Sequence, residues 1–204
     1  MLDFYGRAYD AFLGTLLKGT RRWMASYVRE HSLFPALDLC TGTGAFPRYL
    51  EADPRHAAWG LDLDARFLRY ARSQAPRVPF IRGDAGQLPF RDSVFGAIIL
   101  SYAVHDKAPP LRAAMMEESR RVLRAQGQVL FLDFESPWDL ASRAGRVFTY
   151  GIERLAGGDH FGNSQQFLRA GGLRGFLERF GCEELECRHI PWGNSRIVAT
   201  RFLG

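Results

Sequence analysis

Short apolar runs alternate with stretches of helical periodicity along most of the chain, and this alternation predicts an open α/β fold. The apolar runs have the length and continuity of strands that are buried on both faces of a parallel sheet. The stretches between them repeat apolar residues at helical spacing. The predicted strands are 36–39, 57–62, 78–83, 94–101 and 128–134, and the predicted helices between them are 45–52, 64–74 and 108–124.

The pattern changes after Pro137, where two helical stretches precede two β-like runs. Two such runs joined by a turn-rich segment predict an antiparallel hairpin that closes the sheet. Residues 3–30 also have helical spacing, and we expect them to pack on the sheet or to cover the site. The later elements are predicted as helices 139–155 and 164–180, the second interrupted at Gly171-Gly172, and strands 182–190 and 196–202.

These elements predict a single α/β domain with a Rossmann-like, doubly wound, mostly parallel sheet of seven strands. Its C-terminal hairpin is antiparallel and its N-terminal helices cover the sheet. With 204 residues the chain can bury a full core. We divide it into N-terminal helices (1–34), a ligand-binding core (35–137), a lid (138–167), and a C-terminal helix with the closing hairpin (168–204).

Composition and charge exclude several classes of function. The formal net charge is +5, but no basic run is dense enough to indicate a nucleic-acid partner. No secretory signal and no membrane-spanning stretch is recognisable, and the cysteines, Cys40, Cys182 and Cys187, have no paired spacing. We therefore expect a cytoplasmic protein with reduced cysteines and no metal site.

Candidate chemistry gathers where the predicted strands end, which is where open α/β sheets bind their ligands. Asp38 ends the first strand and is followed by the glycine turn 42–44, while Asp62 and Asp84 end the next two strands. Asp62 lies 20 residues after Gly42, a spacing that suits a carboxylate accepting both hydroxyl groups of a ribose. Asp84 would then lie farther out, where an adenine amino group could donate to it.

Dinucleotide binding is the main competing interpretation of the glycine turn. Its Gly-x-Gly-x-x-Gly pattern requires a third glycine, and Pro47 stands there instead. Each aspartate taken alone could equally well cap a helix. As a spaced set, the carboxylates favour a nucleoside ligand with cationic sulfonium and ammonium groups over a ligand with a pyrophosphate.

Several of these stretches resemble the ordered motifs of class I S-adenosylmethionine-dependent methyltransferases. Within that class the chain is most similar to the ubiquinone/menaquinone-biosynthesis C-methyltransferases and their small-molecule relatives. The resemblance covers roughly residues 4–137. It rests on 38–44, Asp62, 83–92, 94–101 and 118–128, and the closer similarity rests on Thr41-Gly42-Thr43-Gly44, Leu88-Pro89-Phe90 and 132–137.

The resemblance implies that S-adenosylmethionine is the cofactor and that a small, lipophilic or aromatic molecule receives its methyl group. It implies that the glycine turn meets the methionyl part, that Asp62 holds the ribose with Leu63 beside it, and that Asp84-Ala85 meets the adenine. The turn contributes Asp38, Cys40, Thr41, Gly42 and Gly44, while Ser101 would lie by the methionyl group and Tyr9 could close over it.

Two departures from the family bear on catalysis. Gly96 stands where the family usually has an aspartate, and Val104-His105-Asp106 replaces the Arg-Asn motif of the quinone enzymes, which argues against a quinone-ring substrate. His105 and His160 are the candidate bases, because histidine titrates near neutrality. A base is needed only if the accepting atom starts protonated.

Two alternatives stay open. The chain could be a non-catalytic module that binds S-adenosylmethionine, for which Gly96 and His105-Asp106 are hints. It could also methylate a phospholipid or quinone at a membrane surface, because the leading helices combine aromatic and basic residues. An ordinary amphipathic helix is the preferred explanation of those residues, which are Lys18, Arg21, Arg22, Trp23 and Tyr27.

Overall fold

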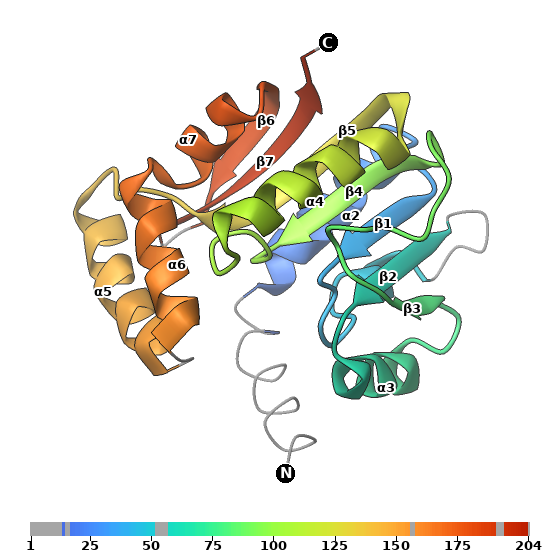
Figure 1. The fold of residues 1–204 in the computed structure, drawn as a ribbon, viewed down its shortest axis with the longest axis horizontal. Helices are drawn as coiled ribbons and strands as arrows, with labels where there is room; N and C mark the ends of the chain where they lie inside the picture. Colours follow the sequence, from blue (N-terminus) through green and yellow to red (C-terminus); the bar gives the residue numbers. More distant parts are fainter. Residues whose placement is uncertain (1–13, 15–16, 52–56, 156–157, 191–193, 204) are drawn as a thin grey trace.

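Seven strands form a single sheet in the order β3-β2-β1-β4-β5-β7-β6 (Figure 1). The computed structural model describes residues 14, 17–51, 57–155, 158–190 and 194–203. The first five strands of that order run parallel, and β7 is antiparallel to both β5 and β6. The predicted sheet and its closing hairpin are therefore confirmed. The strands are β1 (Ala36–Leu39), β2 (Ala58–Asp62), β3 (Phe80–Arg82), β4 (Phe95–Ser101), β5 (Leu123–Phe134), β6 (Cys182–His189) and β7 (Ser195–Phe202).

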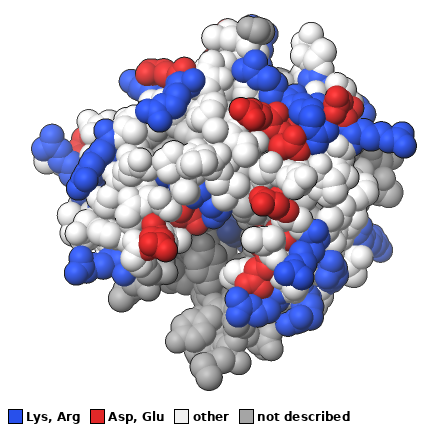
Figure 2. Space-filling view, viewed as in Figure 1, with Lys and Arg blue, Asp and Glu red and all other residues white. Residues whose placement is uncertain are grey.

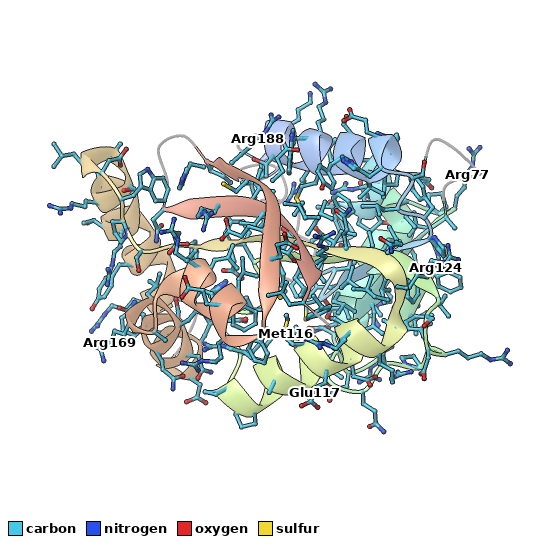
Figure 3. All side chains as sticks on the ribbon, turned by 90° about the horizontal axis from the view of Figure 1, so that it is seen from above. Arg77, Met116, Glu117, Arg124, Arg169 and Arg188 are labelled. Carbon is cyan, nitrogen blue, oxygen red and sulfur yellow. The ribbon has the colours of Figure 1, made fainter. Side chains whose placement is uncertain are left out.

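Successive residues of the central strands point to opposite faces of the sheet and fill two separate cores. In β4, Ile98 and Leu100 pack in the core beneath α4 (Pro109–Val122) and α7 (Gly172–Arg179), while Ile99 packs in the core beneath α2 (Lys18–Glu30). Figure 3 shows these helix layers on either side of the sheet, with Met116 on the inner side of α4 and Glu117 on its outer side.

The helices next to the cleft begin as their sequences predict. The Asp64 carboxylate accepts a hydrogen bond from the Arg66 backbone at 2.7 Å and caps α3 (Ala65–Gln74). Two prolines open α4, where a missing N–H costs nothing. Strand β5 starts directly after α4, earlier than predicted, because Leu123 already pairs with Phe95.

The predicted helix over 45–52 is wrong. Over 45–51, the part of this range that the structure describes, the chain forms one 3₁₀ turn, η1 (Pro47–Tyr49). The Tyr49 and Leu50 backbone N–H groups donate to the carbonyls three residues before them, not four. The Arg29 guanidinium donates to the Tyr49 carbonyl, so a different element takes the acceptor that a continuing helix would use.

Two helices after β5 stand at the outer edge of the molecule. α5 (Leu140–Leu155) packs on α6 (Gly158–Arg169), and α7 returns to β5 and β6 (Figure 1). The predicted helix 139–155 is confirmed, and the region 164–180 is two helices separated at Gly171, whose φ is +101°. Within the described ranges, every helix is too short or too polar to cross a lipid bilayer.

Candidate functional site

A cleft opens at the carboxyl ends of β1 to β4, where the sequence predicts the ligand. Its volume is about 360 Å³, which is in the range of small-molecule sites. Figure 2 shows a hollow near the centre of this face, with charged side chains of both signs around it. The lining residues are Cys40, Gly42, Thr43, Leu61, Asp62, Leu63, Asp64, Phe67, Gly83, Asp84, Ala85, Tyr102, Lys107, Leu111 and Met115.

The turn after β1 is tight and closely packed. Cys40, Gly42 and Gly44 all have positive φ, at 55°, 53° and 70°. Gly44 has no room for a side chain, because a Cβ there would lie 2.7 Å from Cζ of Phe80. Its N–H donates to the Thr41 carbonyl at 2.9 Å. The turn therefore packs against β3 on one side and leaves the Gly42 backbone at the cleft.

The Asp62 carboxylate ties this turn to the end of β2. Its Oδ2 accepts the Gly42 N–H at 2.8 Å, and its Oδ1 accepts the Asp64 N–H at 2.9 Å. Each carboxylate oxygen has about two lone-pair sites, so each can accept one further hydrogen bond. Asp62 can therefore fix the turn and accept the two hydroxyl groups of a ribose at the same time.

The outer part of the cleft combines a second carboxylate with apolar walls. Asp84 is exposed, and its Oδ1 accepts the Gly86 N–H at 2.8 Å. Ala85 is buried beside it, whereas the Leu63 side chain is 64% exposed at the mouth. The exposed Leu63 side chain and the Asp84 carboxylate together suit a flat heteroaromatic ring with an amino group. Phe67, Leu111 and Met115 complete this apolar wall.

Four other predicted cofactor residues, Asp38, Thr41, Gly44 and Ser101, do not line the cleft. Asp38 is buried, and the Thr41 hydroxyl donates to its Oδ2 at 2.5 Å. Burial raises the pKa of Asp38 to about 7, against the Thr41 hydrogen bond and the charge of Arg21. Asp38 and Thr41 therefore support the turn from behind. Tyr9, the remaining candidate, lies outside the described residues.

Lys107 lines the cleft and was missed in the sequence analysis. Its Nζ donates to both oxygens of Asp106, at 2.7 and 2.8 Å. Burial lowers the pKa of the Lys107 ammonium, but the charges of Asp106 and Asp62 outweigh burial and raise it overall, so Lys107 stays charged. The sequence signal that singles out Lys107 is the rarity of lysine, because the chain has only two. Burial raises the pKa of Cys40 to about 12, so this thiol stays protonated and acts as a packing residue.

The two predicted bases lie side by side, with ring centroids 5.6 Å apart. His105 Nδ1 is 2.8 Å from Oδ1 of Asp133, and because a carboxylate only accepts, Nδ1 carries the proton. Nε2 of His160, from α6, is 3.3 Å from Oδ2 of Asp106. The His160 side chain is 32% exposed and that of His105 only 5%. The sequence signal for Asp133 is that it is the one carboxylate in the predicted strand 128–134, which is otherwise largely apolar.

Arg112 and Asn163 fasten α6 to the loop after β4. The buried Arg112 guanidinium donates to the carbonyls of Val104, His105 and Asn163, each at 2.8 Å. The Asn163 amide donates to the Asp106 carbonyl at 3.0 Å. These bonds hold His160 over the end of β4.

Comparisons with known proteins agree with this geometry. Residues 36–127 match the family model described as a methyltransferase domain. The demethylmenaquinone methyltransferase of Thermotoga maritima is 30% identical over 131 residues, 64% of this chain and 56% of that protein. The enzyme of that name in Mycolicibacterium gilvum is 32% identical over 141 residues, 67% of this chain and 60% of that protein. The chain thus spans less than two thirds of the length of these relatives.

A solved structure shows that the fold extends over nearly the whole chain. A SAM-dependent methyltransferase of Thermotoga maritima superposes with a TM-score of 0.66 at 17% identity, covering 98% of this chain and 95% of that one. The cleft also fits the cofactor of such proteins, because it offers a turn without side chains, carboxylates at neighbouring strand ends and an apolar wall. Residues 36–127 therefore form a methyltransferase domain, and the chain is similar to S-adenosylmethionine-dependent methyltransferases of quinone biosynthesis.

Proposed function

We propose that this protein transfers a methyl group from S-adenosylmethionine to a small acceptor that is apolar or aromatic. One observation carries the proposal: Asp62 and Asp84 stand at neighbouring strand ends around an apolar cleft, beside two histidines that each contact a carboxylate. S-adenosylmethionine supplies an activated methyl on a sulfonium when it is bound. The task of the protein is to align the acceptor with that methyl and to exclude water.

The chain offers a partner for each part of the cofactor. Asp62 would accept the ribose hydroxyl groups, and Asp84 with Ala85 would meet the adenine ring. The Gly42 backbone and Cys40 would lie along the methionyl part. Lys107 is the cation in the cleft that suits the cofactor's carboxylate, because it is charged and partly buried.

His160 is the better placed of the two candidate bases. Its Nε2 lies 3.3 Å from Oδ2 of Asp106, so the buried Nδ1 is the nitrogen that would accept a proton from a hydroxyl or an acidic carbon bound against it. His105 is almost fully buried and held by Asp133, so we assign it a positioning role for the loop after β4. Helices α5 and α6, which make up most of the predicted lid of 138–167, would form the outer wall of the acceptor site.

The acceptor proposed first is an aromatic ring of the quinol type, because the names of the relatives outweigh the Val104-His105-Asp106 departure from the Arg-Asn motif. The names of the curated relatives point to a quinone precursor. Aromatic rings surround the histidines, since Phe134 lies 4.5 Å from His105 and 5.3 Å from Tyr102, centroid to centroid. Such rings favour edge-to-face or offset contacts with an aromatic acceptor.

The non-catalytic alternative loses one of its two hints. A Cβ at Gly96 would lie 2.6 Å from the backbone of Leu33, so close packing explains why an aspartate is missing there. Gly96 is also at the start of β4, at the opposite end of the strand from the cleft. The glycine at position 96 therefore gives no information on whether the protein is a catalyst.

Calorimetric titration with S-adenosylmethionine and with its demethylated product tests cofactor binding. Asp62→Ala should weaken the affinity at least about tenfold, because hydrogen bonds to a charged acceptor contribute about 1.5–3 kcal/mol each. Asp92→Ala is the matched control, since this exposed carboxylate lies on Arg121. Unchanged affinity in Asp62→Ala would refute the ribose assignment, and no binding by the wild type would refute the proposal.

Turnover of a panel of phenols and quinols tests the reaction. His160→Ala should lower kcat while leaving cofactor affinity unchanged. His31→Ala, at the end of α2, is the control. Full activity of His160→Ala with a hydroxyl acceptor would exclude His160 as the base.

A further inference from the structure

Exposed apolar side chains are concentrated around α5. Seven large apolar side chains are exposed among the described residues, and four of them belong to the short segment 138–150. Leu140 is 82% exposed and Val147 74%, and Trp138 and Tyr150 are exposed as well. A soluble surface usually scatters such residues singly, so a cluster of them indicates an interaction site.

The exposed apolar residues share one face of the helix with arginines. At 3.6 residues per turn, Leu140, Arg143, Val147, Tyr150 and Arg154 fall within about 80° of the helix circumference. Arg146 lies next to this arc. Tyr150 and Arg154, at the C-terminal end of this arc, contact α6, so we call Leu140, Arg143, Arg146 and Val147 the outer face of α5. Both charged residues of this face are arginines.

A hollow of about 440 Å³ lies along the outer face. It is lined by Pro137, Arg143, Arg146, Val147 and Tyr150, so its described walls are apolar and cationic. Figure 2 shows basic side chains among uncharged surface at the left edge of the molecule, where α5 stands. The hollow offers room for an acyl chain or a headgroup between the two arginines.

The C-terminal end of α5 is already occupied. α5 packs on α6, where Tyr150 lies 4.9 Å from Phe161 and the Arg154 guanidinium lies 6.0 Å from the same ring. Figures 1 and 3 both place α5 at one end of the molecule, away from the sheet. Leu140 and Val147 of the outer face precede this contact and stay exposed, while α6 leads from it to His160 at the acceptor site.

We propose that the outer face of α5 docks on an anionic lipid surface. Apolar side chains interleaved with arginines are the composition of helices that lie in the membrane interface, and Trp138 beside them suits the headgroup level. The arginines would attract anionic headgroups while Leu140 and Val147 enter the acyl region.

A second copy of the chain is the main competing occupant of this face. A two-fold contact through the outer face would place Arg143 and Arg146 close to the same residues of the other copy. Such apposed like charges oppose self-association, whereas an anionic surface neutralises them. Charge complementarity therefore favours the lipid.

The role of this docking rests on the proposed function. A lipophilic acceptor would be dissolved in the bilayer, and an enzyme held at its surface by α5 would meet that acceptor without drawing it through water. The docking itself requires neither cofactor nor turnover, so the two proposals can fail separately.

Cosedimentation of the full chain with vesicles tests the docking. Vesicles of phosphatidylcholine alone should bind weakly, and vesicles with about a third of phosphatidylglycerol should bind strongly, with affinity falling as salt is added. Leu140→Asp/Val147→Asp and Arg143→Glu/Arg146→Glu should each lower the partition coefficient at least about tenfold.

Two matched controls carry the same chemical changes elsewhere. Leu185→Asp/Leu203→Asp alters exposed leucines of the closing hairpin region, and Arg77→Glu/Arg91→Glu alters exposed arginines remote from α5. Both should bind vesicles within about twofold of the wild type. Every variant should retain its calorimetric affinity for S-adenosylmethionine, which shows that it is folded.

Three results would overturn the docking proposal. The first is no preference of the wild type for anionic vesicles at low salt. The second is equal loss of binding in the control variants and the α5 variants. The third is a dimer in analytical ultracentrifugation that Val147→Asp dissociates, which would assign the outer face to a second copy. Vesicle binding without turnover of any acceptor would refute the proposed function and leave the docking intact.

Discussion

At Gly96, strand β4 is closely packed against residues 33–35, the segment that leads into β1. Its N–H donates to the Pro35 carbonyl at 2.8 Å. A Cβ at this position would lie 2.6 Å from the Leu33 carbonyl carbon, 2.9 Å from the Phe34 nitrogen and 3.0 Å from the Leu33 Cα. All three atoms are backbone, so no side-chain rotation can relieve the contact. Gly96→Ala must therefore displace the strand or the segment.

The expected cost can be worked from these contacts. Overpacking of a rigid site costs about 1–3 kcal/mol, and stretching the hydrogen bond to Pro35 adds up to about 1 kcal/mol. We therefore expect Gly96→Ala to lower the free energy of unfolding by about 3 kcal/mol, a large part of the about 5–15 kcal/mol that such a domain possesses. Cofactor affinity of the folded variant should not change, because Gly96 is at the far end of β4.

Urea unfolding followed by tryptophan fluorescence measures this cost. Gly162→Ala is the control, because nothing lies within 4 Å of a Cβ at this position inside α6. It should gain about 0.5–1 kcal/mol from helix propensity. If the free energy of unfolding of Gly96→Ala were within about 0.5 kcal/mol of the wild-type value, the reasoning would be refuted, since surface substitutions commonly have effects of that size.

Two further predictions concern the supports of the site. The native pKa of Asp38, about 7, is above the 3.8 of the unfolded chain, so its ionisation reduces stability as the pH rises from about 4 to about 7. Urea unfolding should therefore show Asp38→Asn gaining on the wild type over that window, by up to about 4 kcal/mol, and a constant difference would contradict the burial argument. Arg112→Met should cost about 3 kcal/mol, because three carbonyls lose a buried charged donor. Hydrogen exchange should then speed up in α6, and unchanged exchange over 158–169 would show that other contacts hold the helix.

The sheet and the cofactor half of the site could be predicted because both depend on local pattern. A buried strand needs a continuous apolar run, and the residue that ends it reaches the ligand edge by topology alone. Asp62 and Asp84 therefore line the cleft as predicted. The helix over 45–52 could not be excluded from sequence, because the guanidinium that takes the Tyr49 carbonyl comes from α2.

The acceptor half of the site depends on contacts between distant segments. His105 meets Asp133 across 28 positions of sequence, and Arg112 meets Asn163 across 51. Periodicity carries no information about such pairs. Both histidines could be selected for their chemistry, but which of them is buried was decided by the packing of α6 on the loop after β4.

The attachment of α6 has a consequence for how such a protein can evolve. Arg112 bonds only main-chain carbonyls, at Val104, His105 and Asn163, and every residue type supplies a carbonyl. The Arg112 part of the junction is therefore indifferent to the side chain at position 163, whereas the Asn163 amide and His160 add contacts that depend on their side chains. Much of α5 and α6 can therefore change in sequence while Arg112 still holds α6 beside the cofactor cleft. One arginine thus gives this part of the molecule freedom to acquire new acceptors.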